Sequence, residues 1–278
     1  MKIQYQSDEL IILESSLFRT TSTIIISEKS ILLVDPNWLP IEIEFIANLI
    51  DKIGKDKEKY LLFTHSDYDH IIGYGRFKGY NTLASQNFID NPDKGSILSQ
   101  IKVFDDENYI LRDYDISFPE IETIIKGDSQ SLKIYSDEYL FWQAKGHNID
   151  GIITFNKTKG ILIVGDYLSN IEFPYIFDTV QNYKDTLDKL ELIIQTENVK
   201  FLISGHGDFT TDIDEMQLRI KESRNYIHEL ESSVKNDTDF DFAKLFRRYQ
   251  FPGIMKQFHE GNLVLVAKDK NMDSHTIC

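Results

Sequence analysis

The chain has 278 residues, of which 41% are hydrophobic and 27% charged, a composition ordinary for a soluble globular protein with a substantial core. Its formal net charge of −15 argues against partners such as nucleic acids or anionic membranes. The chain start shows no secretory segment, no stretch approaches the roughly 18 apolar residues of a membrane span, and the one cysteine, Cys278, has no partner for an internal disulfide. We therefore expect a cytoplasmic protein.

The first third of the chain predicts strands followed by a helix. Residues 9–35 hold three short runs rich in Ile, Leu and Val, separated by polar breaks, which is typical of consecutive β-strands. Residues 41–53 place apolar side chains at helical spacing, and Gly54 follows as a stop. KYLLFTH, residues 59–65, then predicts a short buried strand.

The rest of the chain continues this alternation. Residues 86–104 favour a helix, although Pro92 and Gly95 interrupt its pattern. We expect strands within 121–164, helices at 182–196, 213–235 and 239–250, and a strand that ends at His206; the last twenty residues are ambiguous. This order predicts an α/β protein with layered, largely mixed sheets. Nucleotide-binding glycine motifs and a GxSxG elbow are absent.

The stretch FTHSDYDHIIG, residues 63–73, concentrates side chains that bind metals. His65, Asp67, Asp69 and His70 lie within six residues, directly after an apolar strand. Each residue alone would more often be a cap or a surface group. Together, at the point where a strand leaves the core, they predict a site at the edge of a sheet.

The same arrangement recurs at three more predicted strand ends. His147 follows EYLFWQA, Asp166 follows GILIVG and His206 follows VKFLISG. As at His65, each of these residues comes directly after Gly or Thr, where the backbone can turn sharply. Four histidines and three aspartates delivered in this way make a set of ligands for two metal ions.

These motifs resemble the metallo-β-lactamase fold superfamily, whose signature after a strand is HxHxDH. The segment 65–70, HSDYDH, matches it with Asp67 at the third position, and KGHNIDG, VGDY and SGHGD match the later ligands. The resemblance implies a four-layer αβ/βα sandwich with metals at one edge of the sheets. We expect a single domain over residues 1–278, with a core at about 10–210 and a helical C-terminal region at about 211–278.

The resemblance also implies a role for each ligand. One ion would take His65, Asp67 and His147, the other Asp69, His70 and His206, and Asp166 would bridge the two. Asp35, in LLVDP, would brace the site from a neighbouring strand. A hydroxide shared by the two metals would attack a small ester, lactone, thioester or phosphoester, and Asp69 and Asp166 would act as catalytic groups that orient it.

Asp67 departs from the family pattern, which has His at that position. With Asp67, Asp69, Asp166 and a hydroxide, two divalent ions form a neutral centre, whereas His would leave it at +1. We expect zinc first, with iron or manganese as alternatives because a carboxylate favours harder metals. The alternative function is a diiron oxygen-binding or oxygen-reactive protein, which resembles the flavodiiron proteins. The segment after His206 is too short for their flavodoxin domain of roughly 100–150 residues.

Three further residues are weaker candidates for contact with a substrate. Tyr68 and Tyr167 adjoin metal-site segments, and His259 could reach the pocket from the C-terminal region. Packing and structural roles remain the alternatives for all three. The expected partner is a small molecule whose identity the sequence does not reveal, and the oligomeric state stays open, a homodimer included.

Overall fold

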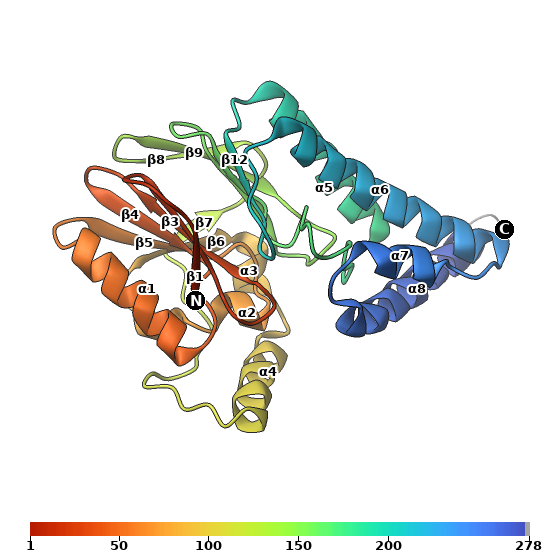
Figure 1. Cartoon of the computed structure of the whole chain (residues 1–278), viewed down its shortest axis with the longest axis horizontal. Coiled ribbons are helices and arrows are strands. Elements are labelled where there is room, and N and C mark those ends of the chain that lie inside the picture. The colour runs from red at the N-terminus through yellow and green to blue at the C-terminus, as the bar shows by residue number, and fades with distance from the viewer. Residues whose placement is uncertain (276–278) are drawn as a thin grey trace.

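The computed structural model describes the backbone of residues 1–275, and the side chains of these residues other than 248 and 269–275. Cys278 lies outside the described residues. Two β-sheets pack against each other, and helices cover both outer faces (Figure 1). This is the four-layer αβ/βα sandwich that the sequence predicted.

The first sheet holds seven strands in the order of the chain: β1 (Lys2–Gln6), β2 (Leu10–Glu14), β3 (Thr21–Ile26), β4 (Ser30–Val34), β5 (Glu58–Leu62), β6 (Asn81–Ser85) and β7 (Thr123–Ile125). Neighbours from β1 to β4 are antiparallel, and neighbours from β4 to β7 are parallel. The second sheet has the order β12 (Phe201–Ile203), β11 (Ile161–Ile163), β10 (Ile152–Asn156), β9 (Asp137–Gln143) and β8 (Gln130–Ile134). Only β11 and β12 are parallel among its described pairs.

Continuous apolar runs become strands because both faces of each sheet are buried. In β2, Leu10 and Ile12 face the second sheet, whereas Ile11 and Leu13 face the helices on the outer side. The same alternation continues through β4 and β5. The core between the sheets therefore has largely apolar walls on both sides, although the buried residues Thr23 and Thr154 also lie within its strands.

The helices fall into two groups, one on each outer face. On the first sheet lie α1 (Pro40–Ile53), α2 (Tyr68–Ile71), the 3₁₀ turn η1 (Tyr74–Phe77), α3 (Gln86–Asp90) and α4 (Lys94–Glu107). On the second lie α5 (Val180–Thr196) and α6 (Ile213–Asn236), while α7 (Phe242–Arg248) and α8 (Pro252–His275) extend this layer and pack against α6. Figure 1 shows α7 and α8 beside the far end of α6.

Three elements differ from the sequence prediction. β1 adds a strand before residue 9 and pairs with β2 at the edge of the sheet. The helix expected at 86–104 is two helices, because Pro92 lacks a backbone donor and disfavours helical backbone at Asn91. The ambiguous C-terminal residues belong to α8 up to His275, the last described residue, and the weak amphipathic pattern of this helix gave no clear signal. No helix in the described part of the chain is long and apolar enough to cross a membrane.

Candidate metal centre

The candidate ligands gather where strands of both sheets end. β9, β11 and β12 run in the same direction, so the segments with His147, Asp166 and His206 leave the second sheet at one edge. Backbone hydrogen bonds tie this edge to the first sheet. Ile152 donates to the Thr64 carbonyl at 2.8 Å, and Thr21 donates to the Gly205 carbonyl at 2.7 Å.

The seven predicted ligands form two adjacent groups. His65, Asp67, His147 and Asp166 make the first, and Asp69, His70 and His206 make the second. Within each group, the atoms able to bind a metal lie within 4.8 Å of one another. The other six residues divide between the groups as the resemblance implied, and Asp166, the implied bridge, falls in the first.

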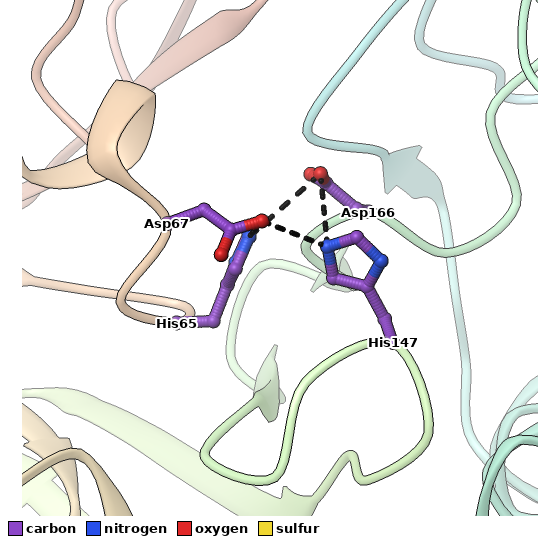
Figure 2. Close-up of side chains that lie close together, drawn as sticks. All are labelled: His65, Asp67, His147 and Asp166. Atoms are coloured by element: carbon purple, nitrogen blue, oxygen red, sulfur yellow. Dashed lines mark hydrogen bonds and ion pairs between the residues drawn. The ribbon is translucent and has the colours of Figure 1, made fainter. Parts of the chain in front are cut away.

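The first group converges on one point, as Figure 2 shows. Asp67 Oδ2 lies 3.2 Å from His147 Nε2 and 3.6 Å from His65 Nε2. Asp166 Oδ2 lies 3.3 Å from His147 Nε2 and 3.7 Å from His65 Nε2. Two imidazoles and two carboxylates thus face each other across a small gap.

Asp166 also reaches the second group. Its Oδ1 lies 3.1 Å from His70 Nε2, and its Oδ2 lies 3.3 Å from His206 Nε2. Asp69 Oδ2 completes this group at 3.6 Å from His70 Nε2 and 3.5 Å from His206 Nε2. One carboxylate therefore stands between two ligand sets, which is the position a bridging ligand needs.

All four imidazoles present Nε2 to the centre because Nδ1 is engaged elsewhere. His147 Nδ1 lies 2.9 Å from the Tyr175 carbonyl, and His206 Nδ1 lies 2.9 Å from the Phe18 carbonyl. Such partners orient the ring and select the tautomer that leaves Nε2 free for a metal.

Asp35 orients the rings of the other two histidines, His65 and His70. Its Oδ2 accepts from His70 Nδ1 at 3.0 Å and from the Thr64 hydroxyl at 2.6 Å, while its Oδ1 accepts from the Thr64 backbone at 2.9 Å. The Thr64 oxygen in turn lies 2.9 Å from His65 Nδ1. One buried carboxylate therefore orients both rings, one of them through a threonine hydroxyl.

The donor set fits two divalent metal ions. His65 Nε2, His70 Nε2 and Asp166 Oδ1 are buried and make no well-formed hydrogen bond among the described residues, although facing charged groups lie 3.1 to 3.7 Å away. A bound cation would satisfy all three atoms. The spacing fits too. Ligands about 2.0–2.2 Å from a tetrahedral ion lie about 3.3–3.6 Å apart, close to the separations of 3.1 to 3.7 Å between facing donors.

Without metal, the acidic and imidazole groups hold each other in charged forms. Burial disfavours the charge on Asp67, yet His147 and His65 keep its pKa well below the usual range. Burial likewise opposes a charge on His147, yet Asp166 and Asp67 raise its pKa well above 6.5. The proton on His147 thus supplies positive charge that a metal would replace, so metal binding there would release it.

Asp67 has a further partner that sequence reasoning missed. The Asn148 side chain donates to Asp67 Oδ1 at 2.6 Å, which leaves Oδ2 to face His65 and His147. Asn148 directly follows the candidate ligand His147 in the chain, and this position is the one sequence feature that could have indicated its role. This amide orients the carboxylate that stands in place of the family's usual histidine.

A cavity of about 430 Å³ opens onto the centre, a size suited to a small organic molecule. Tyr68 lines it, together with Asp67, Asp69, Asp166 and His147. A tyrosine from α2 therefore stands where contact with a substrate is expected.

The structure does not place Tyr167 or His259 in the lining. The buried Tyr167 hydroxyl accepts from the His147 backbone at 2.9 Å and donates to the Lys145 carbonyl at 2.7 Å, so it supports a ligand loop. His259 is fully buried between helices, with Nδ1 3.0 Å from the Tyr226 hydroxyl. Packing outweighs substrate contact at both positions because each polar group is directed into the protein interior.

The lining contains an acid that sequence reasoning also missed. Glu172 borders the cavity, half-buried, and burial raises its pKa to about 7 although His206 opposes the shift. The sequence feature that could have indicated this role is an acidic side chain placed between the apolar residues Ile171 and Phe173. Phe18, Tyr175, Phe177, Ile254 and Phe258 make much of the remaining wall.

Solved structures with the same fold belong to the metallo-β-lactamase superfamily. The sec-alkylsulfatase Pisa1 from Pseudomonas sp. superimposes with a TM-score of 0.67 at 13% identity, over 84% of this chain and 42% of that one. A metallo-β-lactamase family protein from Thermus thermophilus gives 0.61 at 16% identity, over 91% and 92%. A metallo-β-lactamase from Cronobacter sakazakii, with a mutated motif, gives 0.60 at 15% identity, over 85% and 99%.

Comparison of the sequence alone finds no matching family model and no matching curated protein. The chain spans less than half the length of the sulfatase. At 13 to 16% identity these structural likenesses establish the metallo-β-lactamase fold of this chain.

Proposed function

We propose that the protein is a hydrolase that binds two divalent metal ions and cleaves a small ester, lactone, thioester or phosphoester. One observation carries this proposal: Asp166 stands between two sets of buried imidazole and carboxylate donors at the bottom of a cavity. When bound, two ions in such a site activate water as a nucleophile and polarise the bond under attack.

The protein's own groups have separate tasks in this reaction. Asp69 and Asp166 line the cavity beside the histidines, where they can orient the attacking water and accept its proton. Hydrolysis places the hydroxyl on the acyl or phosphoryl centre and a proton on the leaving oxygen, or on the leaving sulfur of a thioester. The apolar wall excludes bulk water and holds the substrate in place.

The metal content of protein purified without added metal, measured by elemental mass spectrometry, is the first test. We expect two ions per chain, zinc in the first place. Activity is then screened on esters, lactones, thioesters and phosphodiesters, and on alkyl sulfates because of the structural neighbour. Asp166→Asn should abolish the activity and lower the metal content. A protein that takes up no metal on reconstitution would overturn the proposal.

A second candidate function follows from Asp67. A carboxylate in the first ligand group favours iron or manganese over zinc, which supports a diiron protein that binds or reacts with oxygen. An optical spectrum in air and after reduction separates the two functions. Two irons with an oxygen-sensitive absorption band would support the second, and a colourless protein with zinc would support hydrolysis.

A further inference from the structure

Glu172 places a carboxylate in the cavity wall in addition to the carboxylates of the two ligand groups. It lines the cavity but belongs to neither set of potential metal ligands. Among the lining residues that the structure describes, none is a lysine or an arginine. Arg19, beside Phe18 in the chain, is already bound to Glu14 and Asp208. His147 and His206 also line the cavity, but both belong to the ligand groups and would give up their protons to bound metal. In the metal-loaded protein the described lining therefore offers the Glu172 carboxylate no cationic side chain.

The metal ions would not neutralise Glu172 either. Two divalent ions bring four positive charges. Asp67, Asp69 and Asp166 bring three negative charges, and the hydroxide nucleophile brings a fourth. Glu172 then leaves the loaded cavity with a net negative charge, in a place where half-burial weakens screening by water. A positively charged group on the substrate would balance it.

The wall near Glu172 is aromatic, which suits an organic cation. The rings of Tyr175 and Phe258 stack with centroids 4.1 Å apart, and Phe177 meets Phe258 edge-on at 6.1 Å. Phe177 also approaches the His147 ring at 5.3 Å. Its side chain is 54% exposed, so the ring remains available for contact. Aromatic faces attract ammonium groups, most strongly where water is excluded.

We propose that the substrate carries an alkylammonium group beside the bond to be hydrolysed, and that Glu172 with the wall of Tyr175, Phe177 and Phe258 recognises that group. This inference rests on the proposed hydrolase function for its reaction and deepens it by naming the substrate class. An anionic group at the same place would face Glu172 without a lysine or arginine partner in the described lining.

Kinetics on two esters of nearly the same shape test the inference. The acetates of choline and of 3,3-dimethylbutanol differ by one positive charge. We compare the ratio of their kcat/KM values in the metal-loaded wild type and in Glu172→Gln at pH 8.5, above the pKa of about 7 that burial gives Glu172. We expect the preference for the cation to fall about tenfold in the variant. Comparing this ratio between the two proteins cancels the difference in intrinsic reactivity of the esters.

A matched control keeps the change in overall charge the same. Glu122 is exposed and lies just before β7, outside the cavity lining. Glu122→Gln should keep the wild-type ratio. Glu172→Lys should favour the neutral ester over the choline ester.

Direct binding supplies a readout that does not need turnover. Calorimetric titration of the metal-loaded protein with benzyltrimethylammonium should give a Kd about tenfold weaker in Glu172→Gln than in Glu122→Gln. Hydrolysis of both acetates with equal ratios in wild type and Glu172→Gln, and equal Kd values, would overturn the inference and leave the hydrolase proposal standing. Binding of the cation that depends on Glu172, without hydrolysis of any ester, would support cation recognition and count against the hydrolase.

Discussion

Small groups around the ligands decide the shape of the candidate metal centre. Gly205 lies directly before the ligand His206, and its amide donates to the Gly165 carbonyl, next to Asp166. A Cβ at Gly205 would lie 2.1 Å from Asp166 Oδ1 and 2.9 Å from His70 Cε1. The close approach of these two segments therefore requires a residue without a side chain.

Gly205→Ala is expected to displace Asp166 and His70 and to release at least one metal ion. Because a shift of about 1 Å at a reacting centre can cost about 100-fold in rate, kcat/KM should fall by about that factor. Elemental mass spectrometry and kinetics measure the two effects. Gly95→Ala is the control, because a Cβ there meets nothing within 4 Å. Wild-type metal content in Gly205→Ala would contradict the geometry.

Asp35→Asn tests the brace behind the two histidines. The Asp35 carboxylate accepts three hydrogen bonds, two from Thr64 and one from His70, and an amide cannot accept all of them because its nitrogen is a donor. Asp35 has a φ of 49°, which asparagine tolerates, so the backbone should be kept. We expect metal affinity to fall about 10–100-fold. Competition with a fluorescent chelator measures it, and an unchanged affinity would argue against the brace.

Among the elements, α8 has two roles at once. Phe258 and Ile254 reach the cavity from this helix, while the next residue, His259, packs on the opposite side against Phe240 and Phe242 at 4.3 and 4.5 Å between ring centroids. The cavity wall therefore depends on how α8 is fastened to α6 and α7. His259 contributes to the packing of α8 on α6 and α7, and this structural role accounts for its burial, whereas contact with a substrate does not.

We expect acidic pH to destabilise the packing of α8 against α6 and α7. Burial lowers the pKa of His259 to about 4, against about 6.5 in an unfolded chain. Since the unfolded state binds the proton first, stability is lost as pH falls from about 6.5 towards 4. Thermal unfolding at pH 7.5 and 5 measures the loss. His259→Gln, which stays neutral, should lose less, and an equal loss in both proteins would contradict this assignment.

At the scale of the whole molecule, the candidate centre links the two sheets. His65, Asp67, Asp69 and His70 follow a strand of the first sheet, whereas His147, Asp166 and His206 follow strands of the second. Metal ions bound there would hold the two layers together at one edge. They would also offset part of the negative charge of a chain with a formal net charge of −15.

Removal of metal is therefore expected to destabilise the fold. A ligand at roughly 100 times its Kd stabilises a protein by about 3 kcal/mol, so chelation should lower Tm by about 6–12 °C. Scanning calorimetry before and after chelation, with metal added back, measures the change. Identical transitions in all three samples would contradict a metal link between the sheets.

The metal-free protein should also depend on pH in the alkaline range. Although burial opposes its charge, Glu172, Asp166 and Asp69 raise the pKa of His206 to about 10. The protonated imidazole then stabilises the fold fully below about pH 6.5, and this contribution is lost as pH rises towards 10. The gain in Tm from added metal should therefore be larger at pH 9 than at pH 6.5. A gain that shrinks with rising pH would contradict this expectation.

The order of strands and helices, and the positions of the candidate ligands, could be predicted from the sequence because both depend on local patterns. Period-2 and helical spacing of apolar residues reflect burial of a face, and His65, His147, Asp166 and His206 stand directly after apolar runs. Elements with weak patterns were missed, such as the edge strand β1, or left ambiguous, such as α8.

Only the tertiary structure decided which distant groups meet. The sequence does not show that Asp35 orients both His65 and His70, that Asn148 holds Asp67, or that Glu172 lines the cavity. The physical reason is that these contacts join segments far apart in the chain, either after neighbouring strands of one sheet, as for Asp35, or from opposite sheets and loops. Their distances depend on how the layers pack, which no local spacing along the chain specifies.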